Sequence, residues 1–242
     1  MRVYFFKLRN LIFLLILTFA IILGIIFFVN RESRMTDAFY AGMSEPYVVI
    51  DAGHGGLDGG AVSPAGIIEA PLNLAISIKT RDIFSFLGLA AIMTREDENS
   101  LDYAEDKTLK GNKTADLKAR LELAKDNPNC DFLSIHLNKF EQAKYKGAQV
   151  FYSPNNEKSI VLATAIQEKM RQYLDPENTR RARLSPDTVY LMKNIMSPAV
   201  TIECGFLSNA EEVQQLVLPS YQTKIALSIC FGYIYYLEMS DV

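Results

Sequence analysis

Both histidines of the chain follow directly on short apolar segments. His54 closes the sequence VVIDAGH, and His136 closes FLSIH. A third apolar segment, AVTI, is followed at once by Glu203. Because the carboxyl ends of strands in an open α/β sheet form its usual binding edge, we expect these three side chains to meet there. Two imidazoles and a carboxylate predict a metal site or an acid–base site.

The residue types favour a zinc site with a third ligand close to the first histidine. Two imidazoles, one carboxylate and a position left to water form a common catalytic zinc arrangement. Asp51, Asp58 and Glu69 are the acids within reach of His54. Each of these acids also has another interpretation. Asp51 lies where it would orient His54, Asp58 is typical of a turn, and Glu69 is typical of the first turn of a helix. Glu203 would then serve as general base toward a zinc-bound water.

The glycine-rich loop after the first apolar segment does not match nucleotide-binding loops. A dinucleotide fingerprint starting at Gly53 would need glycine where Asp58 stands, and a P-loop would need lysine where Ala61 follows Gly60. The chain also has no His-Glu-x-x-His motif.

The three cysteines exclude a disulfide scaffold and a four-thiolate zinc site. Cys204 adjoins Glu203, whose charge would raise the pKa of the thiol, so a nucleophilic role is disfavoured. We expect Cys130, Cys204 and Cys230 to pack as small apolar side chains.

The elements that must position these residues alternate between strand and helix. This alternation predicts an α/β fold with a mostly parallel sheet and helices on both faces. The expected strands cover residues 47–50, 89–94, 132–135, 147–152, 189–192 and 199–202. The expected helices cover residues 71–87, 115–125, 159–174 and 221–237, the third with Ile160, Ala163, Ile166, Met170 and Tyr173 on one side.

The N-terminal region predicts a membrane segment. Residues 11–29 are apolar apart from Thr18 and Gly24, and as a helix they would span roughly 30 Å of bilayer core. The run exceeds the core of a signal peptide, which favours an uncleaved anchor, although cleavage would give a secreted protein. Preceding basic residues indicate a cytoplasmic N-terminus and an extracytoplasmic main domain. The expected organisation is an N-terminal anchor in residues 1–30, a linker in 31–45 and a catalytic domain in 46–238.

The charge balance argues against nucleic-acid binding. The chain has 25 Lys and Arg against 28 Asp and Glu, and the basic residues Arg2, Lys7 and Arg9 precede or border the apolar run. The remainder is therefore more acidic than the chain as a whole, whereas nucleic-acid partners require a basic face.

Four separated motifs together resemble a known family. They are VVIDAGHGG around His54, Glu69 fifteen positions later, SIHLN around His136 and ECGFLSN from Glu203. The order and spacing resemble the zinc-dependent N-acetylmuramoyl-L-alanine amidases of the amidase type 3 family, over roughly residues 46–238.

This resemblance implies an open six-stranded α/β fold and one Zn²⁺ per chain. It implies that His54, Glu69 and His136 bind the metal and that Glu203 is the catalytic acid and base. The implied reaction is hydrolysis of the amide between N-acetylmuramic acid and L-alanine of the peptidoglycan stem peptide.

The short anchored form is most similar to the germination-specific amidases of endospore formers. That likeness implies action on spore cortex, before muramic-δ-lactam is made, in the cell wall or the forespore intermembrane space. Because no wall-binding repeat is recognisable, targeting would depend on the membrane anchor or on an accessory protein.

Several alternatives remain open from the residues. A membrane-anchored, non-catalytic peptidoglycan-binding or scaffold protein could keep this fold, whereas a His-x-x-Glu carboxypeptidase is disfavoured by Leu57. The sequence RRAR from Arg180 is typical of a solvated loop, or it would contact carboxylates of the stem peptide. Asn138 would contact substrate or form a turn. The tyrosines of residues 221–237 would pack on the sheet or form a surface for a partner.

Overall fold

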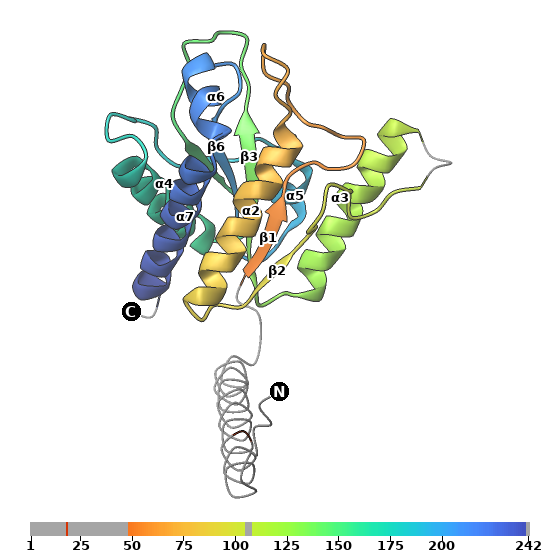
Figure 1. Ribbon diagram of the computed structural model, residues 1–242. Coiled ribbons are helices and arrows are strands. Elements are labelled where there is room, and N and C mark those ends of the chain that lie inside the picture. Colours follow the sequence, from red (N-terminus) through yellow and green to blue (C-terminus); the bar gives the residue numbers. More distant parts are fainter. Residues whose placement is uncertain (1–17, 19–47, 105–107, 241–242) are drawn as a thin grey trace, which may run out of the picture. The chain divides into compact units, whose positions relative to one another are not determined.

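The computed structural model describes residues 18, 48–104 and 108–240, which form an α/β domain from Val48 onward (Figure 1). The strands are β1 (Val48–Ala52), β2 (Ala91–Met93), β3 (Asp131–Asn138), β4 (Gln149–Tyr152), β5 (Arg183–Leu184) and β6 (Ala199–Phe206). The helices of the domain are α2 (Glu69–Phe86), α3 (Leu109–Asp126), α4 (Lys158–Tyr173), α5 (Tyr190–Asn194), α6 (Ala210–Leu216) and α7 (Pro219–Ser240).

The six described strands form one mixed sheet in the order β2-β1-β3-β6-β4-β5. Pairings β1–β2, β1–β3, β3–β6 and β4–β5 are parallel, and β4 runs antiparallel to β6. The prediction of a mostly parallel α/β sheet is confirmed, with one reversal of direction between β6 and β4. Consequently the carboxyl ends of β1, β3 and β6 share an edge with the amino ends of β4 and β5.

Apolar side chains of the sheet alternate between two helix layers. Val48 and Ile50 belong to the larger core, which includes buried residues of α2, α4 and α7, while Val49 belongs to a smaller core with α3 and α5. This alternation is the period-two pattern of a strand buried on both faces. The prediction that helices cover both faces is confirmed (Figure 1).

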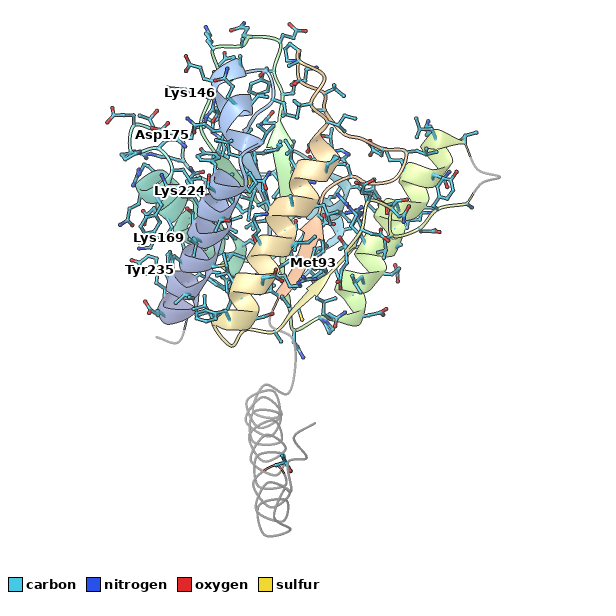
Figure 2. All side chains as sticks on the ribbon, viewed as in Figure 1. Met93, Lys146, Lys169, Asp175, Lys224 and Tyr235 are labelled. Atoms are coloured by element: carbon cyan, nitrogen blue, oxygen red, sulfur yellow. The ribbon has the colours of Figure 1, made fainter. Side chains whose placement is uncertain are left out.

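The C-terminal helix packs inward through its tyrosines. Tyr233 and Tyr236 are buried, and Tyr235 is partly exposed beneath Lys169, whose Nζ lies 5.0 Å from the ring centroid. Lys224 projects from the outer side of α7 (Figure 2). Of the two alternatives for the tyrosines of this helix, packing and a partner surface, packing is therefore the one that applies to Tyr233 and Tyr236.

The predicted strand at 189–192 is wrong, because these residues enter the short helix α5. Leu191 and Met192 lie on the inner side of α5 and pack with Val49 and Phe132 in the smaller core. A run of four apolar residues is compatible with a strand or a buried helix, so periodicity did not distinguish them. The sixth strand is instead β5, in which both residues are exposed.

Several helix boundaries also differ from expectation. Helix α3 begins at Leu109, six residues before the predicted start, because the side chain of Thr108 accepts a hydrogen bond from Gly111 and caps it. In α4, Ile160 and Tyr173 are exposed rather than buried, and Leu162 and Ala165 face the core. Helix α6 was not predicted, although Asn209 caps it by accepting from the backbone N–H groups of residues 211 and 212.

Within the described ranges, no helix combines the length and apolar character needed to cross a membrane. The predicted membrane segment at residues 11–29, apart from Thr18, and the predicted linker at 31–45 lie outside the described residues. Both therefore remain predictions.

Candidate active site

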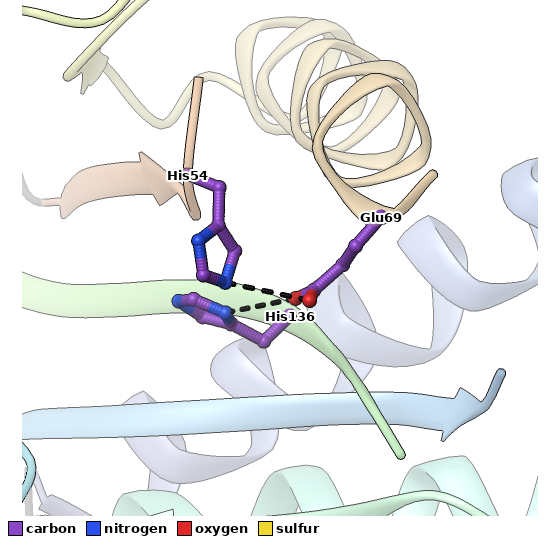
Figure 3. A group of neighbouring side chains, drawn as sticks. All are labelled: His54, Glu69 and His136. Atoms are coloured by element: carbon purple, nitrogen blue, oxygen red, sulfur yellow. Dashed lines mark hydrogen bonds and ion pairs between the residues drawn. The ribbon is translucent and has the colours of Figure 1, made fainter. Parts of the chain in front are cut away.

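The three predicted ligands meet at one edge of the sheet. His54, Glu69 and His136 each offer a donor atom, and these atoms lie within 4.8 Å of one another. The carboxylate of Glu69 contacts both imidazoles from one side, with Oε1 3.0 Å from Nδ1 of His136 and Oε2 3.3 Å from Nε2 of His54 (Figure 3). The structure thus brings together residues from three separate motifs.

Each of these side chains comes from a different element. His54 follows β1, Glu69 is the first residue of α2, and His136 lies inside β3, which continues two residues beyond it. Glu203 lies inside β6 and pairs directly with His136 across the parallel ladder. Because paired residues of adjacent strands point to the same face of a sheet, Glu203 is placed beside the histidine cluster.

The loop that carries His54 is held by two buried arginines. Arg95 donates through Nε to the carbonyl of Ala52 and through Nη2 to that of Gly53, at 2.9 and 3.1 Å. Arg120 donates to the carbonyls of Ala52 and His54 at 2.8 and 2.7 Å. His54 itself has a φ of 61°, a left-handed conformation that costs energy for a residue with a Cβ. These carbonyl contacts stabilise that conformation.

Asp51 anchors this arginine network and does not contact His54. Its carboxylate accepts hydrogen bonds from Arg120, Thr94 and Ser134. Burial alone would raise the pKa of Asp51, but the Arg120 charge and these hydrogen bonds hold that pKa below its usual value. The interpretation of Asp51 as the residue that orients His54 is therefore wrong.

Asp58 performs that orientation instead. Its Oδ2 lies 2.9 Å from Nδ1 of His54 and 2.9 Å from Nζ of Lys113 on α3. Because an ionised carboxylate only accepts, Nδ1 of His54 donates, and Nε2 is left to face Glu69. Burial alone would lower the pKa of His54, yet the carboxylates of Asp58 and Glu69 raise it to about 9. Of the three candidate acids, Glu69 joins the ligand cluster and Asp58 supports it.

Glu69 is buried and heavily hydrogen-bonded. It accepts from the backbone N–H groups of Ala61 and Leu137 at 2.8 and 3.1 Å, and from Nδ2 of Asn73 at 3.0 Å. Burial alone would raise the pKa of Glu69, but its contacts with His136 and His54 hold the pKa well below its usual range. The carboxylate is therefore ionised, as a metal ligand must be.

Two glycines leave room for this cluster. A Cβ on Gly53 would lie 2.3 Å from the His136 ring, and a Cβ on Gly60 would lie 2.6 Å from both Oε2 of Glu69 and the His54 ring. Gly60 also has a φ of +72°, which disfavours other residues. The glycine-rich sequence around His54 thus permits close approach of backbone and ligands.

Glu203 is electrostatically unusual. Its Oε2 is shielded from solvent and has no hydrogen-bond partner among the described residues. Burial, aided by the nearby Glu69 charge, raises the pKa of Glu203 to about 7, although His136 opposes the shift. A carboxylate with a pKa near neutrality is suited to accept and return a proton.

The cysteines behave as expected. All three are buried thiols. Burial, with Glu203 and Glu69 nearby, raises the pKa of Cys204 well above its usual value, which makes it a poor nucleophile.

A groove of about 770 Å³ extends from Glu203 over β6, β4 and β5. Its lining includes Asn138, Phe140 and Tyr145 on one segment and Arg180 and Arg183 on another. Sequence reasoning placed Asn138 and these arginines among the candidates for substrate contact but did not predict a shared groove. The register of β4 and β5, which brings them together, was not visible in the sequence.

Comparisons with known proteins agree with this arrangement. Residues 48–234 match the family model described as N-acetylmuramoyl-L-alanine amidase. The germination-specific N-acetylmuramoyl-L-alanine amidase of Bacillus subtilis is 36% identical over 200 residues, covering 82% of this chain and 83% of the relative.

Solved structures give the same result. The CwlD amidase of Clostridioides difficile, determined in complex with the GerS lipoprotein, aligns with a TM-score of 0.77 and 41% identity, covering 81% of this chain and 100% of that one. The amidase AmiC2 of Nostoc punctiforme aligns with a TM-score of 0.67 and 27% identity, covering 80% and 97%.

Proposed function

The chain belongs to the N-acetylmuramoyl-L-alanine amidase family, and from this membership we propose how its site acts and where. The protein is a peptidoglycan amidase, which hydrolyses the amide between N-acetylmuramic acid and L-alanine of the stem peptide.

We propose that His54, Glu69 and His136 hold one Zn²⁺. The donor set fits this ion, because two imidazole nitrogens and one carboxylate oxygen within 4.8 Å are ligands that zinc takes in hydrolases. The ionised state of Glu69 and the orientation of His54 by Asp58 support the same assignment. When bound, zinc lowers the pKa of a coordinated water and polarises the amide carbonyl.

Glu203 is the proposed general base and acid. Its carboxylate takes a proton from the attacking water and returns it to the departing nitrogen of L-alanine, so that the amine leaves uncharged. The single observation that carries this role is the shielded Oε2 of Glu203, which lacks a protein partner and lies on the strand position paired with His136. An unsatisfied buried oxygen of this kind is costly unless substrate or water completes it.

The proposed setting is spore cortex maturation, where removal of the stem peptide precedes formation of muramic-δ-lactam. Support comes from the relative in Bacillus subtilis, whose name records a germination-specific role. We further propose that residues 11–29 anchor the chain in a membrane with the catalytic domain extracytoplasmic. The C. difficile relative was solved with a lipoprotein, which supports an accessory protein as partner.

The test combines metal analysis with digestion of peptidoglycan by the full chain. Wild type is expected to hold about one zinc and to release L-alanine amino groups while leaving the glycan intact. Glu203→Gln is expected to keep the metal and lose activity by about 10²–10⁴-fold, the usual contribution of a general acid–base group. His136→Ala is expected to lose both. Zinc-loaded wild type without turnover would point to a missing accessory protein or a specialised substrate. Wild type that takes up no zinc even in excess would favour the alternative of a non-catalytic wall-binding protein.

A further inference from the structure

The floor of the groove is one face of the sheet. Glu203 pairs with Gln149 across the antiparallel β6–β4 ladder, and Phe151 pairs with Thr201 on β6 and with Arg183 on β5. Because paired residues, and residues two apart along a strand, share a face, all five side chains point to the same side. Each of the five lines the groove. Glu203 and Arg183 therefore face one continuous surface.

The positive charge of this surface lies at its β5 side. Arg180 is held in place because Nε donates to the carbonyl of Lys146 and Nη1 donates to Oε1 of Gln149, both at 3.0 Å. Its guanidinium also stacks 4.7 Å from the centroid of the Phe206 ring. Within the described residues, the side chain of Arg183 makes no hydrogen bond or ion pair. The acid Glu141 also lines the groove, but from the segment between β3 and β4.

The substrate carries its charge on one side of the bond that is cut. The glycan and the lactyl amide of muramic acid are uncharged, whereas the stem peptide bears free carboxylates. The pair of arginines therefore matches the peptide rather than the glycan. Arg183 lies two strand spacings from β6, about 10 Å, and is level with Thr201, two residues or about 7 Å along the strand from Glu203. The Cα atoms of Arg183 and Glu203 are therefore about 12 Å apart, and extended peptide covers about 3.3–3.6 Å per residue. An arginine at that distance reaches the first few stem residues, of which the second is an acidic D-glutamate.

We propose that Arg183, supported by the positioned Arg180, forms a subsite for the free α-carboxylate of the second stem residue. The inference rests on the proposed function, because it assigns the cut amide to the vicinity of Glu203. It makes Arg183 a specificity residue that distinguishes a stem peptide with a free carboxylate from one in which this carboxylate is amidated.

The first experiment uses the zinc-loaded full chain and two sets of soluble glycan strands. Their stem peptides differ only at the second residue, which is D-glutamate in one set and its α-amide in the other. Wild type is expected to show a kcat/KM about tenfold higher on the acid, mainly through KM, because a charge-assisted pair is lost on the amide. Arg183→Gln is expected to lose about tenfold on the acid and to change little on the amide.

Arg181→Gln is the matched control. It removes the same charge from the neighbouring position, but Arg181 does not line this groove. It is expected to keep the preference of wild type. Equal activity of wild type on both substrates would overturn the proposal, as would an equal loss on both in Arg183→Gln, which would indicate a structural role.

Equilibrium binding of the two free tetrapeptides separates this proposal from the amidase mechanism. A preference for the acid peptide that disappears in Arg183→Gln supports the subsite even if turnover is absent, and the absence of turnover then counts against the proposed function alone. Peptide binding without preference overturns the subsite even if wild type hydrolyses peptidoglycan.

Discussion

Asp58 illustrates how single residues adjust this site from outside the ligand set. Its carboxylate holds the Nδ1–H of His54, which leaves Nε2 as the nitrogen available to a metal, and is itself paired with Lys113. Both contacts hold the pKa of Asp58 well below its usual range, led by the hydrogen bond with His54. The imidazole is thereby oriented before any metal arrives.

Asp58→Asn is expected to weaken zinc binding by about 10–100-fold, since such supporting partners usually contribute that much. The substitution keeps the size of the side chain but removes its charge. Competition with a zinc chelator measures the change in affinity. Lys113→Gln serves as the control, because it removes a partner of Asp58 without touching His54 and should have a smaller effect. Unchanged affinity in Asp58→Asn would contradict the orienting role.

The residues proposed to bind the metal or transfer the proton could be predicted from the sequence, but the residues that hold them in position could not. His54, His136 and Glu203 each follow an apolar segment, so the topology of an α/β sheet was enough to place them at one edge. Arg120 lies 66 residues from the His54 carbonyl that it binds. An arginine in a polar helix usually belongs to the surface, and only the packing of α3 against the sheet makes it a buried anchor.

At the scale of elements, the loop between β1 and α2 is shaped by glycines with different surroundings. Gly60 and Gly66 both have positive φ, at +72° and +84°. A Cβ on Gly60 would collide with Glu69 and His54, whereas a Cβ on Gly66 would meet nothing within 4 Å. Alanine substitutions at the two positions therefore distinguish the effect of backbone strain from the effect of a Cβ that obstructs the site.

Gly66→Ala is expected to lower the free energy of unfolding by about 1–2 kcal/mol, the cost of a left-handed alanine, and Gly60→Ala by at least as much, because its Cβ also collides with Glu69 and His54. Gly60→Ala alone is expected to lose zinc affinity. Urea unfolding and chelator competition measure the two effects. Loss of zinc in both variants would show that loop strain, and not the obstructing Cβ, controls the site.

The contact between β3 and α7 makes a pH-dependent contribution to stability. Asp131 at the start of β3 accepts a hydrogen bond from the hydroxyl of Tyr233 at 2.9 Å. Burial raises the pKa of Asp131 to about 6, although Tyr233 opposes the shift. The folded state then binds a proton more tightly than the unfolded state, so this residue lowers stability as pH rises from about 4 to 6.

Asp131→Asn is therefore expected to raise the free energy of unfolding at pH 7.5 by on the order of 2 kcal/mol. At pH 4 the gain should largely vanish, because the wild-type carboxyl is then protonated in the folded state. Urea unfolding of both chains at the two pH values measures the difference. An equal effect at both values would mean that packing rather than ionisation dominates.

Elements with apolar periodicity were predicted more reliably than polar or very short ones. The strands β1, β3 and β6 contain apolar runs that a fully buried strand requires. The first turns of α3 carry no apolar stripe, and the side chain that they bury, Asn112, is polar. Apolar periodicity therefore did not indicate this part of the helix, which the Thr108 side chain caps. The two exposed residues of β5 become a strand only because β4 lies beside them.

At the scale of the whole molecule, the described residues from Val48 to Ser240 belong to one compact unit. The site lies entirely within that unit. Removal of residues 1–44 is expected to leave zinc content and kcat/KM on soluble glycan strands within about twofold, while association with membranes is lost, as an apolar run of this length would mediate it. Fractionation of cells and steady-state kinetics test both points. Membrane association of the shortened chain would contradict an anchor in residues 11–29.

The reversal of strand direction between β6 and β4 has a consequence for how this enzyme can diversify. The proposed zinc ligands and Glu203 lie on or directly after β1, α2, β3 and β6, whereas much of the groove wall comes from the segments that lead into β4 and β5. Those segments reach the same edge only because β4 enters the sheet from there. We therefore expect that exchanging residues 139–148 and 175–182 with those of a relative changes the cell-wall preference and leaves the zinc ligands and Glu203 in place.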